Sequence, residues 1–160
     1  MENKKIRNAR THEYNGIMFK SGLEVTAYKE LTSEGLNPEY EQHTFHVYTG
    51  KKFSVPCYDE HNDRKLKRNV WGVNTYKTQD IKYTPDFICY VPDSEGILRM
   101  MILEIKGYAN DRYPYVKKMF MAWLEENAPH SVFFEVHNKK QLHAAIEVIK
   151  NIKTNNEEIV

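Results

Sequence analysis

The residue types able to support catalysis gather in two short segments of this 160-residue chain. The first is Tyr83-Thr84-Pro85-Asp86-Phe87, and the second is Leu103-Glu104-Ile105-Lys106-Gly107. Turn-forming residues lie between them, from Pro92 to Gly96. The segments therefore fit neighbouring strands of a hairpin, which would bring the two acids close together. Because side chains alternate along a strand, we expect Glu104 and Lys106 to share one face and Ile105 to point to the other.

This set of residues fits metal-assisted hydrolysis of a phosphodiester. Two carboxylates, Asp86 and Glu104, are oxygen ligands of the kind that Mg²⁺ prefers, and the Ile105 backbone carbonyl can complete the site. A bound metal polarises the phosphodiester and lowers the pKa of a bound water. Lys106 would position that water or stabilise developing negative charge. The alternative is that Glu104 and Lys106 are solvated charges at a strand end; Asp86 on the adjacent strand favours the catalytic interpretation.

Apolar periodicity and turn residues predict the elements that position these side chains. We expect a helix over 21–34, strands over 39–48, 81–91 and 97–106, a helix over 112–127, a strand over 131–136, and a last helix capped by Asn138. Residues 1–15 look like a loose arm and 154–160 like a frayed tail. The whole chain, 1–160, is interpreted as one domain.

The order of these elements predicts an α/β fold with a mixed four-stranded sheet flanked by helices. The first three strands can form an antiparallel meander. The helix after the third strand allows the fourth to lie parallel to it through a right-handed crossover.

The chain resembles the PD-(D/E)XK nuclease superfamily, and within it the small phage-type endonucleases related to Holliday-junction resolvases. The resemblance runs from about residue 19 to 147, and its motifs are Ser21-Gly22-Leu23-Glu24, Pro85-Asp86-Phe87, Leu103 to Gly107, and Lys117-Lys118. It implies a restriction-endonuclease-like αβββαβα core. It also implies a Mg²⁺-dependent DNA endonuclease, with Mn²⁺ able to substitute, acting on branched, phage or mobile-element DNA.

Glu24 has two interpretations. With Ser21 it matches a capping box, in which the glutamate only reaches back to the start of its helix. On a helical wheel, however, Glu24 falls between Tyr28 and Leu31, inside the apolar arc. A carboxylate facing the core is costly without a partner. In similar nucleases a glutamate of the first helix joins the metal site, so we favour that role for Glu24.

Other residues are candidates for contacting the substrate. In the resembled family a lysine near the start of the second helix often contacts the phosphate, which places Lys117 and Lys118 there; a solvated helix face is the alternative. Gln42, in the first predicted strand, can also face the site. The inserted basic and aromatic segment 51–80, with Lys65, Lys67 and Arg68, fits a DNA-contacting loop or an extra hairpin with a solvated face.

Composition bears on cellular location, membrane partners and metal type. The net charge is only +1, the hydrophobic fraction is 41%, and no apolar run is long enough to span a bilayer. The polar N-terminus does not resemble a signal peptide, and two scattered cysteines suggest no disulfide framework. We therefore expect a cytoplasmic location and no membrane partner. Zinc is disfavoured, because His43 and His46 would point to opposite faces of a strand.

Three alternatives to a DNA endonuclease remain open. They are an exonuclease, a transposase-like subunit that cleaves ends, and a catalytically idle nuclease fold that binds DNA or protein, for example in counter-defence. A homodimer is the assembly that symmetric cleavage of two strands would favour.

Overall fold

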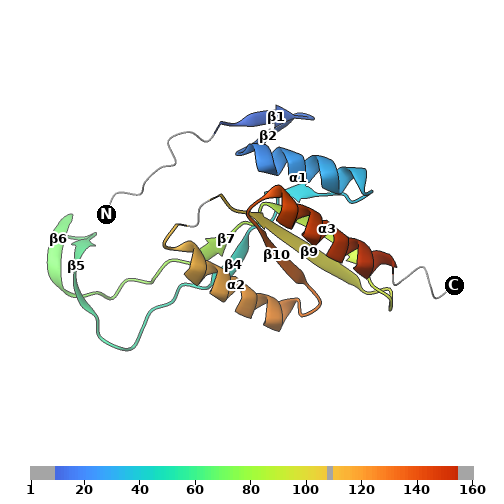
Figure 1. The fold of residues 1–160 in the computed structure, drawn as a ribbon. Helices are drawn as coiled ribbons and strands as arrows, with labels where there is room; N and C mark the ends of the chain where they lie inside the picture. Colours follow the sequence, from blue (N-terminus) through green and yellow to red (C-terminus); the bar gives the residue numbers. More distant parts are fainter. Residues whose placement is uncertain (1–9, 108–109, 155–160) are drawn as a thin grey trace.

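The computed structural model describes residues 10–107 and 110–154 (Figure 1). Its three helices and ten strands are β1 (His12–Tyr14), β2 (Ile17–Phe19), α1 (Gly22–Ser33), β3 (Glu39–Tyr40), β4 (Phe45–Tyr48), β5 (Tyr58–Asp63), β6 (Arg68–Val73), β7 (Ile81–Tyr83), β8 (Phe87–Pro92), β9 (Leu98–Ile105), α2 (Tyr113–Asn127), β10 (Val132–Val136) and α3 (Lys139–Thr154). The chain is thus α/β, as predicted.

The central feature is a mixed four-stranded sheet with strand order β10-β9-β8-β3. Strands β3, β8 and β9 form the predicted antiparallel meander, and β10 runs parallel to β9. The β8–β9 hairpin pairs Phe87 with Leu103 and Pro92 with Leu98. Its turn is held by the Asp93 carboxylate, which accepts hydrogen bonds from the Glu95 and Ile97 amides. This register places the segment before β8 beside the end of β9.

Helices cover both faces of the sheet, as Figure 1 shows. Helices α1 and α3 pack on the face formed by the odd-numbered core residues of β8 and β9, which are Phe87, Cys89, Val91, Met101, Leu103 and Ile105. Helix α2 packs on the other face, with Ile88 and Ile102, and against the small β4–β7 pair. Glu104 lies between Leu103 and Ile105, so strand alternation directs it to the α2 face.

Two predicted strands are each divided in the structure. The strand expected over 39–48 becomes β3, which pairs with β8, and β4, which pairs with β7. Glu41 lies between them with a left-handed backbone (φ 47°), and its amide donates to the Asp86 carbonyl. The strand expected over 81–91 is interrupted at Thr84-Pro85-Asp86. Proline has no N–H for a sheet ladder, so the prediction of one continuous strand was wrong here.

Two hairpins involve the segments that were predicted as a loose arm (1–15) and as either a DNA-contacting loop or an extra hairpin (51–80). Within the arm predicted over 1–15, His12–Tyr14 form β1, paired with β2; residues 1–9 lie outside the described part. Segment 51–80 contains the β5–β6 hairpin, which projects from the body of the molecule (Figure 1). We call residues 51–80 the β5–β6 arm. Of the predicted tail, 155–160 are also outside the described residues.

Candidate active site

Asp86 lies in the break between β7 and β8, and only 9% of it is exposed. Its Oδ2 accepts a hydrogen bond of 2.6 Å from the Ile105 amide, which joins it to the end of β9. Burial and, next, the nearby Glu104 carboxylate hold the pKa of Asp86 above its usual range; Glu24 also raises it, and the Ile105 amide and Lys106 act against them. Asp86 is thus a desolvated acid beside other carboxylates.

Glu104 and Lys106 meet on the α2 face of β9, as strand alternation predicted. The Glu104 carboxylate is 3% exposed, accepts a hydrogen bond of 2.5 Å from the Tyr83 hydroxyl, and lies 2.5 Å from Lys106 Nζ. The Lys106 ammonium also lies 4.4 Å from the centre of the Tyr113 ring, a cation–π contact. Neither Glu104 nor Lys106 is therefore a solvated charge beyond a strand end.

Glu24 belongs to the first turn of α1 and is 5% exposed. Its carboxylate accepts hydrogen bonds from the Ser21 hydroxyl (2.9 Å), the Lys20 amide (2.9 Å) and the Tyr40 hydroxyl (2.6 Å), while the Glu24 amide donates to Ser21 Oγ. Glu24 therefore takes part in helix capping and faces the interior at once. Its charge also contributes to raising the pKa of Asp86.

The donors present suit a hard divalent cation, although the acids are engaged with protein partners. Asp86, Glu104 and Glu24 supply carboxylate oxygen. In an extended strand the N–H and C=O of one residue point to the same neighbour, so the Ile105 carbonyl is directed to the side on which its amide meets Asp86. Within residues 10–107 and 110–154, no three acidic, histidine or cysteine side chains are grouped to hold a metal as they stand.

Five residues around the site were not predicted: Tyr40, Tyr83, Tyr113, Glu135 and His137. Glu135 on β10 pairs in register with Glu104. It accepts hydrogen bonds from Lys117 Nζ (2.5 Å) and the Tyr113 hydroxyl (3.1 Å) and lies 2.8 Å from His137 Nε2. Burial alone would raise the pKa of Glu135, but these three partners together lower it. A lone charged residue in the apolar run Val132 to Val136 was the signal available in the sequence.

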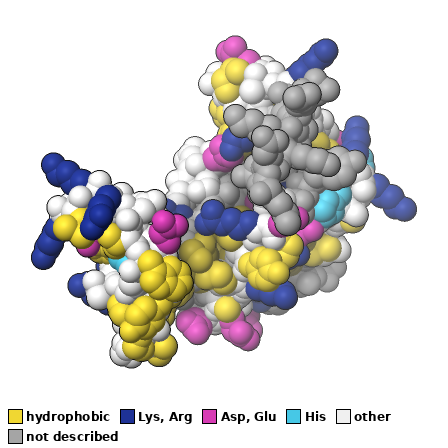
Figure 2. All heavy atoms as spheres, turned by 90° about the vertical axis from the view of Figure 1, so that its left-hand side faces the viewer, with side chains coloured by type: hydrophobic (Ala, Val, Ile, Leu, Met, Phe, Trp, Pro, Cys, Tyr) yellow, Lys and Arg dark blue, Asp and Glu magenta, His cyan; other side chains and the backbone are white. Residues whose placement is uncertain are grey.

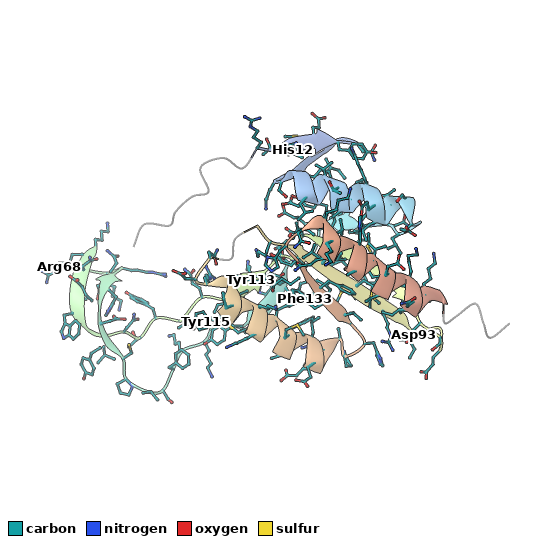
Figure 3. The ribbon with its side chains drawn as sticks, viewed as in Figure 1. His12, Arg68, Asp93, Tyr113, Tyr115 and Phe133 are labelled. Carbon is teal, nitrogen blue, oxygen red and sulfur yellow. The ribbon has the colours of Figure 1, made fainter. Side chains whose placement is uncertain are left out.

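His137 connects the Glu135 cluster to the end of β9. Its Nδ1 lies 2.9 Å from the Lys106 carbonyl oxygen, and the Lys106 amide donates to the Val136 carbonyl. Tyr113, labelled in Figure 3 at the start of α2, contributes its hydroxyl to Glu135 and its ring to Lys106. Burial, and next the charge of Glu104, raise the pKa of Tyr113, so its hydroxyl stays protonated. The position of Lys106 is thus fixed by α2 and β10 together.

The predicted substrate-contacting residues separate into three groups. Lys117 lies next to the site but is paired with Glu135, and its neighbour Lys118 is exposed. Gln42 is exposed in the loop between β3 and β4, so the prediction that it lies in a strand was wrong. Lys65, Lys67 and Arg68 are exposed at the tip of the β5–β6 arm, far from α2 in Figure 3, where Arg68 is labelled.

The candidate zinc ligands do not come together. His43 is paired with Glu39, whereas the His46 ring lies 2.8 Å from the Asp80 carboxylate.

Comparison of the chain with protein-family models, with curated proteins and with solved structures gave no match. In the part of the chain that is described, no helix has both the length and the apolar character to cross a membrane.

Proposed function

We propose that this protein is a Mg²⁺-dependent DNA endonuclease that hydrolyses phosphodiester bonds, with Mn²⁺ able to replace Mg²⁺. The observation that carries the proposal is the meeting of two buried carboxylates, Asp86 and Glu104, with the Lys106 ammonium at the ends of adjacent strands. Burial and the neighbouring Glu104 carboxylate raise the pKa of Asp86, and a divalent cation would accommodate its ionised form better than one lysine does.

The order of elements around the sheet also supports the proposal. Helix α1, strands β3, β8 and β9, helix α2, strand β10 and helix α3 follow one another in the order of a restriction-endonuclease-like αβββαβα core. In that arrangement Asp86, Glu104 and the Ile105 carbonyl would hold the cation, and Glu24 would add a third carboxylate. When bound, Mg²⁺ supplies Lewis-acid polarisation of the phosphate and a more acidic water.

The protein's own groups have distinct roles in this proposal. Lys106 orients the attacking water and stabilises the charge that develops on the phosphate oxygens. The Tyr113 ring and the His137 contact to the Lys106 carbonyl keep this lysine in place. The Tyr83 hydroxyl, whose pKa is raised by burial and by Glu104, stays protonated and fixes one oxygen of that carboxylate. Such positioning of reacting groups is a major source of rate enhancement.

The direct test is nicking of supercoiled plasmid with Mg²⁺, Mn²⁺ or EDTA. We expect cleavage with either metal and none with EDTA. Asp86→Asn should abolish nicking. Asp93→Asn is the matched control, because Asp93 is also a buried acid but lies at the opposite end of the sheet from Tyr113 (Figure 3). Metal-independent nicking, or equal loss in both variants, would contradict the proposal.

One observation favours a second candidate, a nucleic-acid-binding protein with an idle nuclease fold. Each of the three acids already has protein donors, as described above for Glu24, Asp86 and Glu104. An idle protein would bind DNA without nicking it and would show no rise in melting temperature with Mg²⁺. The same plasmid assay, paired with thermal unfolding in Mg²⁺ and in EDTA, separates the two functions.

A further inference from the structure

The β5–β6 arm has one packed face and one open face. On the packed face, His61 contacts the Tyr76 ring at 5.7 Å, and the Arg64 guanidinium lies 5.2 Å from the same ring. Asp59 accepts hydrogen bonds from the His61 ring and the Asn74 amide on this face. The hairpin therefore has a small interior of its own, formed by the segment that follows β6.

The open face carries apolar side chains that nothing covers among the described residues. Register places Tyr58 opposite Val73 and Glu60 opposite Trp71, so Tyr58, Trp71 and Val73 share this face. Tyr58 is 62% exposed, Trp71 is 73% exposed and Val73 is 42% exposed. Trp71 is diagonal to Tyr58 across the two strands, a spacing at which large rings form a continuous surface.

Basic residues are concentrated at the tip of the hairpin. Lys65 and Lys67 lie in the turn and Arg68 begins β6; all three are exposed, and none is within ion-pair distance of a carboxylate in the described chain. The Asp63 carboxylate is occupied in accepting the Lys65 and Leu66 amides, which fixes the turn. Figure 2, which looks toward this side of the molecule, shows basic and hydrophobic side chains side by side on the arm.

Charge is distributed unevenly between the arm and the rest of the chain. Residues 51–80 contain seven Lys and Arg against four Asp and Glu, whereas the other residues contain sixteen against eighteen. The small net charge of the whole chain is thus the sum of a basic arm and a slightly acidic remainder. A surface that combines exposed rings with unpaired basic residues complements a polyanion with accessible bases.

We propose that the open face of the β5–β6 arm binds an unpaired segment of DNA, with bases stacked on Trp71 and Tyr58 and phosphates held by the basic tip. This inference rests on the proposed function, since it names the substrate class as DNA that contains single-stranded or branched regions. Duplex DNA offers phosphates to the tip but no free base faces to the rings.

Fluorescence of Trp71 tests stacking without any cleavage. The chain has two tryptophans, so Trp123→Phe leaves Trp71 as the only one. In EDTA, and with Asp86→Asn to prevent cleavage, a single-stranded oligonucleotide should quench this emission, and the duplex of the same sequence should quench it far less. Equal quenching by both, or none by either, would overturn the proposal.

Affinity measurements separate the rings from the charges. Trp71→Ala should weaken binding to the single strand about tenfold or more, which is the usual effect of losing one stacked base. Trp71→Tyr should retain most of the affinity. The control is Tyr90→Ala, which removes another exposed ring, on β8. If Trp71→Ala instead dissociates a dimer and leaves DNA affinity unchanged, the face is a protein contact and the proposal is wrong.

Salt dependence tests the tip. Lys65→Ala with Lys67→Ala should weaken binding to both single-stranded and duplex DNA and lower the salt slope for the single strand by about 1.4, because two phosphate contacts are lost. Lys140→Ala with Lys153→Ala, on α3, is the matched control. An unchanged slope would remove the tip from the binding surface. Nicking by the wild type without any Trp71 response would refute only the arm; Trp71 quenching without nicking would refute only the endonuclease.

Discussion

Asp86 is buried close to Glu104 and Glu24, so its protonation should affect the free energy of unfolding. Its folded pKa is raised above the usual 3.8, first by burial and then by Glu104. A raised folded pKa means that the native state binds the proton more tightly than the unfolded chain. The contribution is thus present in acid and is lost as pH rises from about 4 through the raised value.

We expect metal-free protein to lose melting temperature as pH rises into the neutral range and Asp86→Asn to show a smaller loss. Saturating Mg²⁺ should flatten the wild-type curve, because a bound cation favours the ionised carboxylate. Thermal unfolding across pH, in EDTA and in Mg²⁺, measures both effects. Identical pH dependence of the wild type and Asp86→Asn in EDTA would show that Asp86 is not destabilised by its charge.

Lys106→Ala should lose activity on the order of a hundredfold or more while keeping DNA affinity. The ammonium acts on charge that develops in the transition state, so rate should suffer more than ground-state binding. Gel-shift affinity and single-turnover nicking measure the two quantities. Lys140→Ala, which removes an exposed lysine of α3, is the comparison. Affinity that falls in parallel with rate would make Lys106 a simple phosphate contact.

Glu24→Gln distinguishes capping from metal binding. Glutamine can still accept the hydrogen bonds from Ser21, Lys20 and Tyr40, so the helix start should survive. Loss of the charge should remove activity, with partial rescue by Mn²⁺ or by higher metal concentration. Nicking rate and the Mg²⁺-induced shift in melting temperature measure the effect. Glu30→Gln on the same helix is the control; a fully active Glu24→Gln would return Glu24 to capping alone.

At the scale of elements, the Phe120 ring connects α2 to β4, β7 and β10. Phe120 is fully buried and lies against the rings of Phe45 (5.0 Å), Tyr83 (4.6 Å) and Phe133 (6.0 Å). Phe120→Ala should therefore lower the free energy of unfolding by about 3–5 kcal/mol. Because Tyr83 also holds Glu104, activity should fall even at temperatures where the variant is folded. Urea unfolding together with nicking at low temperature checks both parts.

The elements that could be predicted are those specified by local sequence. The β8–β9 hairpin followed from the turn residues between Pro92 and Gly96, and the shared face of Glu104 and Lys106 followed from alternation. The sequence also contained the signal for dividing the strand over 81–91, because Pro85 has no N–H with which to continue a sheet ladder. The division of the strand over 39–48 was not, since it depends on the Glu41 amide meeting the Asp86 carbonyl, a contact across the fold.

The unpredicted site residues share a similar physical reason. Tyr113 and Glu135 join the site only when α2 and β10 fold back over β9, and no local pattern specifies that contact. The same holds for Tyr40, whose hydroxyl reaches Glu24 from the first strand of the sheet. Sequence periodicity located the acids, whereas the donors that hold them depend on tertiary packing.

On the scale of the whole molecule, the side-chain hydrogen bonds between the arm and the body lie at the base of the arm in the described structure. The side-chain hydrogen bonds of residues 51–78 in the described structure stay within the arm, and Asp80 ties its base through the Gly50 amide and His46. Replacing 52–77 by a short glycine-rich linker should leave the melting temperature of the body within a few degrees. Nicking of duplex plasmid should persist, and affinity for single strands should fall. Loss of the fold would show that the arm stabilises the body.

The narrow base of the arm has a mechanical consequence. A Cβ at Gly50 would lie 2.0 Å from the Thr78 carbonyl oxygen and would collide with it. The segment that enters the arm and the segment that leaves it are therefore in direct backbone contact at Gly50 and Thr78. The outgoing chain becomes β7 at Ile81 and reaches Asp86 three residues after that strand ends at Tyr83. We therefore expect a force that a bound DNA strand applies to the arm to be transmitted to Asp86. If DNA binding at the arm changes the affinity of Asp86 for a cation, the cation must change the affinity of the arm for DNA by the same factor.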